Sequence, residues 1–345
     1  GVATQLVYAT QPPNPTTAGA DLLPVVELQD THGNVVSTGI DATADISLTI
    51  QSGSGTLAGT GTVKAVAGVA TWVDADNLAI DLIGFKTLEA EKENIGVGTL
   101  ATNSAAFEII HGVATQMVFA TQPANPTSAG DDLLPVVEIQ DSQGNLVSTG
   151  VDSTADVSLT IQSGSGTLAG TSTVKAVAGV ATWNAGHSLD IDLVGFKTLQ
   201  AEKENIGVGT LTENSANFEI IHGVATQLVY ATQPTNPTTA GADLLPVVEV
   251  QDTHGNVVST GIDATADISL TIQSGSGTLS GTTAIKAVAG VATWAGGDSL
   301  AIDLIGFKTL QAEKENIGVG TLTENSANFE ILHFLLFISS FTDVG

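Results

Sequence analysis

Cysteine is absent from this sequence of 345 residues, so no disulfide can stabilise the fold and no thiolate can act as a nucleophile or metal ligand. A domain of about 110 residues can bury enough apolar surface to fold without a disulfide. The absence is therefore compatible with secretion. No apolar run approaches the roughly 18 residues that a membrane-spanning helix needs, and we predict no membrane span.

Arginine is also absent, and the nine lysines are outnumbered by 36 acidic residues, which gives a formal net charge of -27. Nucleic-acid binding needs a basic surface, so we predict no nucleic-acid partner. The same charge disfavours binding to anionic lipid. It is typical of a soluble chain whose copies repel one another unless cations or specific contacts intervene.

Methionine occurs once, at Met117, and the chain begins with Gly1, so we interpret the sequence as a processed or excised segment. A signal peptide would already have been removed from such a segment. Hydrophobic residues make up 42% of the chain and charged residues only 13%. This balance predicts a folded protein rather than a disordered one.

An internal repeat dominates the sequence. GVATQLVYATQP begins at Gly1, GVATQMVFATQP at Gly112 and GVATQLVYATQP again at Gly223, with a period of 111 residues and no insertion or deletion. That period is too long for a solenoid unit and has the size of a whole domain. We therefore predict three tandem domains and a non-repeated tail, over residues 1–111, 112–222, 223–333 and 334–345.

Alternation of apolar and polar residues within each repeat predicts β-strands. Ile46, Leu48 and Ile50 alternate with polar residues, which places one face in a core and the other in water. The segment 88–94 has helical propensity, but its apolar spacing of two favours a strand. We expect about seven strands in each repeat, in the first near 3–11, 24–30, 34–38, 45–51, 61–73, 77–91 and 102–110. The prolines between the first two of these strands predict a loop or crossover.

A short motif between two of these strands predicts a tight turn. It reads DTHGN at 30–34, DSQGN at 141–145 and DTHGN at 252–256. Aspartate accepts hydrogen bonds from backbone N–H groups two residues on, and glycine adopts a positive φ without strain. A calcium loop is the functional alternative, but the ligand spacing and bidentate glutamate of an EF-hand are missing. We favour the turn.

The order of these motifs resembles the bacterial immunoglobulin-like repeat of invasin- and intimin-type adhesins, which also occurs in long repetitive surface proteins and extracellular filament proteins. The resemblance covers all three repeats, and in the first it rests on residues 30–34, 53–60, 68–72 and 107–109. It implies an all-β fold of three tandem immunoglobulin-like sandwiches. It also implies a stalk, adhesin or filament role outside the cell or on its surface, and it implies no particular ligand.

Residues that could bind metal occur at several places without forming a recognisable ligand set. His111, His222 and His333 end the repeats, where they are either a junction metal site or pH switch, or exposed histidines at strand ends; we favour the second interpretation. Acidic clusters could bind calcium and stiffen a stalk. We assign no metal ligand and no cofactor. Calcium binding is kept as an alternative at three acidic clusters, Asp41/Asp45, Asp74/Asp76 and Glu89/Glu91/Glu93.

Other candidate residues have a structural interpretation that we favour. The in-register Trp72 and Phe85 could form a sugar platform but are predicted to lie in the core. Lys64, Lys86 and Lys92 could form isopeptide crosslinks but are predicted to lie on the surface. The glycine-rich stretch 51–60 lacks the ending of a phosphate-binding loop. No Ser/His/Asp arrangement recurs, so we predict that the protein is not an enzyme and has no catalytic residue.

The tail FLLFISSFTDVG replaces the start of a fourth repeat. A strand that is apolar on both faces needs burial on both faces, and an exposed one is an association site. Our hypothesis is that this tail adds a strand to the next subunit, which would give a head-to-tail homopolymer. The alternatives are a strand folded back on the third repeat and the start of a cleaved anchor. The predicted inter-subunit contacts are Phe334, Leu335, Leu336, Phe337, Ile338 and Phe341.

The function that the sequence favours is a structural subunit of an extracellular filament or cell-surface stalk. One alternative is an adhesin module that binds a host or carbohydrate ligand. Another is an accessory region of a larger secreted enzyme. The small polar loops favour the first, because binding loops usually diverge between repeats or carry exposed aromatic residues.

Overall fold

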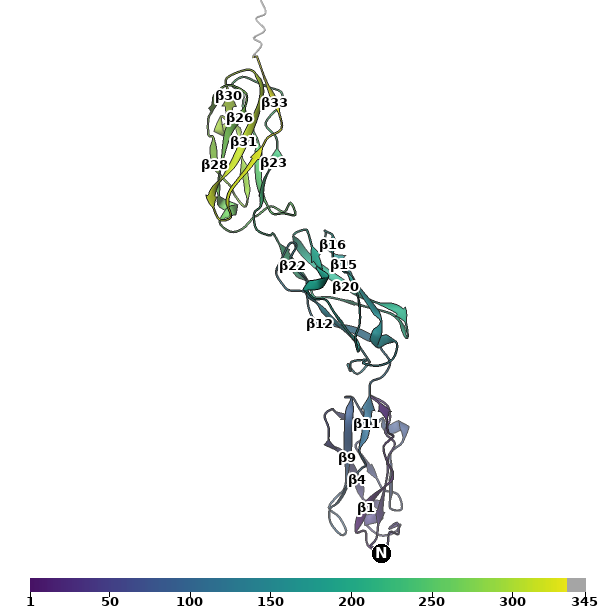
Figure 1. Ribbon diagram of the computed structural model, residues 1–345. Coiled ribbons are helices and arrows are strands. Elements are labelled where there is room, and N and C mark those ends of the chain that lie inside the picture. Colours follow the sequence, from purple (N-terminus) through teal and green to yellow (C-terminus); the bar gives the residue numbers. More distant parts are fainter. Residues whose placement is uncertain (334–345) are drawn as a thin grey trace, which may run out of the picture.

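The computed structural model describes residues 1–333, and the tail 334–345 lies outside the described residues. Regular structure in the described part consists of β-strands and six short 3-10 turns. Each repeat contributes eleven strands in the same order, and the repeats follow one another along an elongated molecule (Figure 1). The predicted all-β class is confirmed. No helix within residues 1–333 is long and apolar enough to cross a membrane.

The elements of the three repeats correspond one to one. The first contains β1 (Gln5–Thr10), β2 (Thr16–Thr17), β3 (Val25–Gln29), η1 (Asp41–Thr43), β4 (Asp45–Ser52), β5 (Leu57–Ala58), β6 (Thr62–Lys64), β7 (Val69–Thr71), η2 (Asp74–Asp76), β8 (Ala79–Ile80), β9 (Gly84–Lys92), β10 (Leu100–Asn103) and β11 (Phe107–Ile110). The second contains β12 (Gln116–Thr121), β13 (Thr127–Ser128), β14 (Val136–Gln140), η3 (Asp152–Thr154), β15 (Asp156–Ser163), β16 (Leu168–Ala169), β17 (Thr173–Lys175), β18 (Val180–Thr182), η4 (Ala185–His187), β19 (Asp190–Ile191), β20 (Gly195–Ile206), β21 (Gly209–Asn214) and β22 (Phe218–Ile221). The third contains β23 (Gln227–Thr232), β24 (Thr238–Thr239), β25 (Val247–Gln251), η5 (Asp263–Thr265), β26 (Asp267–Ser274), β27 (Leu279–Ser280), β28 (Ala284–Lys286), β29 (Val291–Thr293), η6 (Gly296–Asp298), β30 (Ala301–Ile302), β31 (Gly306–Ile317), β32 (Gly320–Asn325) and β33 (Phe329–Leu332).

Two main sheets form each sandwich. In the first repeat the smaller sheet has the order β1-β3-β7, and the larger has the order β2-β11-β9-β4-β6 with β10 paired to β9. Strands β5 and β8 make a separate short ribbon. Only the β2–β11 pair is parallel, and the equivalent pairs in the other repeats are parallel too. This arrangement of two mostly antiparallel sheets is the immunoglobulin-like sandwich.

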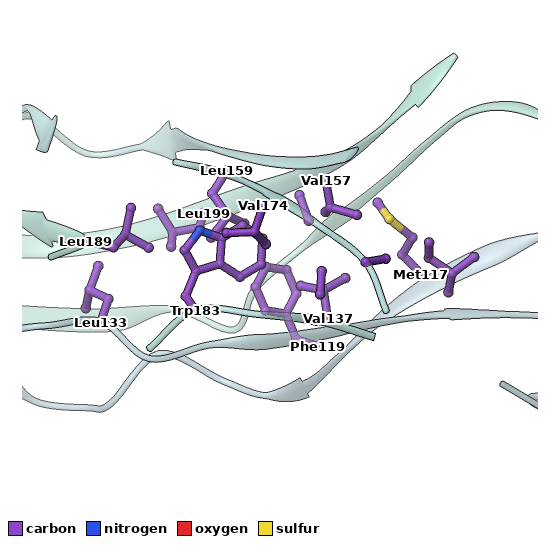
Figure 2. Packing of buried hydrophobic residues seen from close by; sticks show 14 of the residues in the cluster. Met117, Phe119, Leu133, Val137, Val157, Leu159, Val174, Trp183, Leu189 and Leu199 are labelled. Atoms are coloured by element: carbon purple, nitrogen blue, oxygen red, sulfur yellow. The ribbon is translucent and has the colours of Figure 1, made fainter. Parts of the chain in front are cut away.

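Each sandwich has its own core between the two sheets. In the first repeat Leu6 and Val26 come from the smaller sheet, and Ile46, Leu88 and Phe107 from the larger. The three clusters of buried residues each draw on one repeat only. Figure 2 shows the cluster of the second repeat, in which Trp183 lies beside Phe119 and among aliphatic side chains. The separate cores support the predicted boundaries 1–111, 112–222 and 223–333, which we keep as a proposal.

Several predicted strands are divided in the structure. The segment 61–73 reverses at a turn where Ala67 and Gly68 both have positive φ, so β6 joins the larger sheet and β7 the smaller. The segment 77–91 divides into β8 and β9, and 102–110 contains parts of β10 and β11. The segment 34–38 forms only an isolated bridge between Gln29 and Val35. The segment 88–94 is strand through Lys92, as the period of two predicted.

The aromatic residues divide between core and surface. Trp72, Trp183 and Trp294 are buried as predicted, and the Trp72 indole N–H donates to the Thr60 carbonyl at 2.8 Å. The prediction for Phe85 is wrong: this side chain is 68% exposed, and the equivalent Phe196 and Phe307 are 62% and 61% exposed. The inward positions of β9 are 86, 88, 90 and 92, so residue 85 lies on the outer face.

Candidate functional site

The turn 141–145 begins at the end of β14, close to the first repeat, and its local sequence determines its shape. Oδ1 of Asp141 accepts the N–H groups of Gln143 at 2.9 Å and Asn145 at 2.8 Å. Gly144 has a φ of +82°, which glycine adopts without strain. The Asp141 N–H donates to the Asn145 carbonyl at 2.9 Å and closes the loop. These contacts confirm the predicted turn.

The second oxygen of this aspartate holds the connection between repeats. Oδ2 of Asp141 accepts the N–H of Gly112 at 2.8 Å. The preceding residue, His111, is hydrogen-bonded through Nδ1 to the Gly112 carbonyl at 2.8 Å and through Nε2 to Oγ1 of Thr149 at 2.7 Å. The backbone that joins the repeats is therefore fixed on both sides by groups of the second repeat.

Asn145 makes a further direct polar contact from the second repeat to the first. Its Nδ2 donates to the Asp81 carbonyl at 2.8 Å, and its Oδ1 accepts the N–H of Ile83 at 3.3 Å. The residue is only 5% exposed. A primary amide pairs here with one carbonyl and one N–H of a neighbouring backbone, which satisfies both ends of the side chain. This pairing fixes the position of the turn against the loop between β8 and β9.

The second junction repeats this arrangement. Asn256 donates to the Asp192 carbonyl at 2.8 Å and accepts the N–H of Val194 at 3.2 Å. Asp252 accepts the N–H of Gly223 at 2.8 Å, and His222 contacts Oγ1 of Thr260 at 2.8 Å. The contact is thus encoded by the repeat and formed twice. Beside each junction lies a groove lined by both repeats, the first by Ile83, Gly84, Glu108, Ile109, Ile110, His111, Ser148 and Thr149.

Hydrogen bonding controls the charge state of the turn aspartates. Burial raises the pKa of Asp141, but the N–H groups of Gly112, Asn145 and Gln143 stabilise the carboxylate and hold its pKa below the ordinary value. The pKa of Asp252 is lowered for the same reasons. A carboxylate that accepts several N–H groups stays ionised to low pH. Both junctions are therefore held by a charged acceptor near neutral pH.

The two junctions differ at the third residue of the turn. Gln143 packs over Gly19 in the first junction, and His254 packs over Gly130 in the second. These side chains lie so close that neither glycine has room for a β-carbon. Burial raises the pKa of Asp190, and the nearby His254 opposes that rise. His254 therefore belongs to a contact between repeats.

The terminal histidines of the first two repeats are also junction residues. His111 and His222 are half-buried and hydrogen-bonded to the next repeat, so their prediction as exposed strand-end residues is wrong. His333 is exposed. Within residues 1–333 no three His, Asp or Glu side chains gather where they could bind one metal ion.

The acidic clusters predicted as possible calcium ligands do not converge on one point. Oδ1 of Asp41 lies 3.3 Å from Nζ of Lys92, whereas Asp45 pairs with Lys64 at 3.6 Å. Oε1 of Glu93 accepts the Asp45 N–H at 2.9 Å. Asp74 and Asp76 lie in η2, where Asp76 accepts the N–H of Val73. The carboxylates of Asp41, Asp45, Asp76 and Glu93 therefore each have a partner within their own repeat.

Two of the three lysines in each repeat are buried, which corrects their prediction as surface residues. Lys64 is exposed, but Lys86 and Lys92 are 2% and 0% exposed because both occupy inward positions of β9. Nζ of Lys86 donates to the Ile83 carbonyl at 2.9 Å. Nζ of Lys92 donates to the carbonyls of Glu93 and Ile95 besides its ion pair. Burial lowers the pKa of Lys86.

The predicted inter-subunit residues lie outside the described residues: Phe334, Leu335, Leu336, Phe337, Ile338 and Phe341. Their role stays a prediction. Sequence reasoning missed the junction role of Asn145 and Asn256 because it treated them only as the last residues of a turn. The signal available was that asparagine ends the motif in all three repeats, although the glycine alone provides the positive φ.

No protein-family model and no curated protein sequence matches the chain. Among solved structures, the Escherichia coli adhesin FdeC is similar with 19% identity and a TM-score of 0.38, covering 95% of this chain and 100% of that one. The D0-D1 domain of intimin has 17% identity and a TM-score of 0.22, covering 64% and 98%. The S-layer protein rSbsC(31-844) has 12% identity and a TM-score of 0.23, covering 96% and 40%. At these scores the likenesses carry no argument about function.

Proposed function

We propose that this protein is a structural subunit of an extracellular filament or cell-surface stalk that assembles head to tail. The observation that carries the proposal is the junction: the same asparagine, aspartate and histidine join the repeats twice without a linker. A contact that is repeated along one axis favours an open linear assembly over a closed oligomer. Strands of about ten residues rise roughly 3.3 Å each, so three repeats in line span about 100 Å.

The composition supports a role at or outside the cell surface. A net charge of -27 keeps rods soluble and apart until a specific contact or added cations overcome their repulsion. A fold without cysteine also does not depend on the redox state of its surroundings.

The tail supplies the growth step in this proposal. Residues 334–345 replace the start of a fourth repeat and contain three of the ten phenylalanines of the chain. We propose that they add a strand to the sheet of the next subunit, so that the tail of one copy joins the head of another. Such a heterologous contact gives an open polymer.

Electron microscopy of the purified chain tests the proposal. We expect filaments whose axial repeat equals the length of three repeats, and only short rods from a variant that lacks residues 334–345. Filaments of unchanged number and length from the truncated chain would show that the tail is not the joining strand. A wild-type chain that stays as single rods at every concentration and ionic strength would refute the filament itself.

An adhesin module is the second candidate, and the exposed phenylalanines favour it. Phe85, Phe196 and Phe307 recur at the period of the repeat, each more than 60% exposed on the outer face of the larger sheet. A carbohydrate or protein ligand could stack on such a series of aromatic rings. Binding to a glycan array that is lost when all three are changed to alanine would favour this candidate over the first.

A further inference from the structure

The two ends of the described chain present the two halves of the contact that joins its repeats. At each internal junction a turn from one repeat supplies an asparagine, and the loop before the long strand β9 or β20 of the preceding repeat supplies a carbonyl and an N–H. Within the described residues no repeat packs against the turn 30–34 of the first repeat, and residues 31–34 are exposed. The third repeat has the corresponding loop at 303–305.

The turn of the first repeat is already formed in the free chain. Oδ1 of Asp30 accepts the N–H of His32 at 2.9 Å and the N–H of Asn34 at 3.0 Å, as in the internal junctions. Within residues 1–333 the side chain of Asn34 bonds only to Asp30. Asn34 is exposed, whereas Asn145 and Asn256 are each 5% exposed. The head of the molecule therefore offers an ordered amide with spare hydrogen-bonding capacity.

The receiving loop of the third repeat is also formed. Its sequence DLIGF at 303–307 is identical to that at 81–85 in the first junction. Oδ1 of Asp303 accepts the Thr278 N–H at 2.7 Å, and Lys308 donates to the Ile305 carbonyl at 3.0 Å. The equivalent distances beside the first junction are 2.7 Å and 2.9 Å. Among residues 1–333, the Asp303 carbonyl and the Ile305 N–H have no hydrogen-bond partner.

We propose that the turn 30–34 of one copy docks on the loop 303–305 of a second copy in the geometry of the internal junctions. Nδ2 of Asn34 then donates to the Asp303 carbonyl, and its Oδ1 accepts the Ile305 N–H. The two surfaces are complementary because the chain already forms this contact twice with equivalent residues. This inference rests on the proposed filament and names the residues of its subunit contact.

The contact between copies differs from the internal one in strength. Internal junctions are held at high effective concentration by the covalent link between repeats, and the contact between copies has no such link. It is therefore weaker and depends on protein concentration. Copies with a net charge of -27 repel one another, and salt screens this repulsion. Association consequently increases with ionic strength.

Sedimentation of the full chain over a range of concentrations and salt tests the proposal. The wild-type chain forms larger species as concentration rises, and Asn34→Ala weakens this association by about tenfold or more because it removes two hydrogen bonds. The matched control is Asn103→Ala, which removes the same kind of side chain from an exposed position in β10, outside the junction residues and both ends. That control associates like the wild type.

A mixing experiment distinguishes the loss of docking from misfolding of the variant. An Asn34→Ala chain retains its loop 303–305, so adding it to the wild type caps growing chains and shortens them. Capping together with an unchanged melting temperature supports the proposal. Equal association of the wild type and Asn34→Ala overturns it, as does a wild-type chain that stays monomeric at high salt and millimolar concentration.

The variant without residues 334–345 separates this contact from the tail hypothesis. Association that survives removal of the tail but is lost in Asn34→Ala assigns the subunit contact to the turn and refutes the tail as the joining strand. Association that is lost with the tail but survives in Asn34→Ala refutes the docking proposed here and leaves the filament itself standing.

Discussion

Buried lysines are the least expected residues of this protein. Lys203 is fully buried, and its ammonium contacts Oδ1 of Asp152 at 2.8 Å and the carbonyls of Glu204 and Ile206 at 3.0 and 2.8 Å. The pair connects η3 to the end of the long strand β20. Its ammonium has three acceptors, which indicates a structural ion pair rather than a nucleophile for an isopeptide bond.

Removing this lysine is expected to destabilise the second repeat. Breaking a buried ion pair from one side costs about 3 to 5 kcal/mol because the other charge is left without a partner. Lys203→Met should therefore lower one calorimetric transition by at least about 10 °C. The matched control is Lys175→Met, which breaks the exposed pair with Asp156 and should cost at most about 1 kcal/mol. Equal shifts for the two variants would contradict a special role for the buried pair.

The sequence alone could predict some residue positions in β9 but not others. The apolar spacing of two in the segment 88–94 predicted a strand with its apolar residues on one face, and Leu88 and Ala90 are indeed both buried. Phe85 and Lys86 were misplaced because hydrophobicity favoured burying the phenylalanine and exposing the lysine. The alternation of the strand fixes the opposite outcome, and the buried ammonium is accommodated by the Ile83 carbonyl. At both positions the alternation along the strand predicts burial better than the hydrophobicity of the side chain does.

At the scale of elements, the turns were predictable and their partners were not. The turn 30–34 and the turn 141–145 have nearly the same sequence and the same internal hydrogen bonds. One is exposed, and the other is buried against a preceding repeat. No local pattern distinguishes them, because the difference depends on what precedes each repeat in space. The division of 61–73 between two sheets was likewise not predicted, because residues that favour strands occur throughout the segment.

The turn aspartates predict an acid-sensitive stability. Asp252 has a folded pKa below the ordinary value, so its contribution is fully present above about pH 4, the usual pKa of an unfolded aspartate. That contribution is lost as pH falls through the lowered folded pKa, because protonation removes the charged acceptor. The melting temperature should therefore hold between about pH 7 and 5 and fall below about pH 4.

A variant isolates the aspartate from the other carboxylates of the chain. Asp252→Asn should be less stable than the wild type at pH 7 and should lose less stability between pH 5 and pH 3. Thermal unfolding monitored by circular dichroism at several pH values in this range measures how the melting temperature of each protein depends on pH. Identical pH dependence of the two proteins would mean that Asp252 does not hold a lowered pKa at the junction.

At the scale of the whole molecule, three similar repeats follow one another through two equivalent junctions. The repeat period and the all-β class followed from sequence periodicity, whereas the sandwich architecture was implied by the resemblance to bacterial immunoglobulin-like repeats. The junction geometry required coordinates, since it joins residues 62 and 64 positions apart in the chain. The subunit contact proposed for Asn34 continues the same geometry beyond the end of the chain.

Cysteine crosslinking traps the docking proposed for the turn 30–34, because the natural chain has no cysteine to interfere. Ile83 and Ser148 line one groove at the internal junction, and their equivalents between two copies are Ile305 and Ser37. We predict that a chain carrying Ser37→Cys and Ile305→Cys, which keeps Asn34, forms a ladder of oligomers with a short bifunctional thiol reagent. The internal pair Ser148→Cys and Ile83→Cys should crosslink within one chain, and a pair of Ser37→Cys with the exposed Val288→Cys should give only collisional background. A ladder no stronger for the 37/305 pair than for the 37/288 pair would contradict the proposed docking.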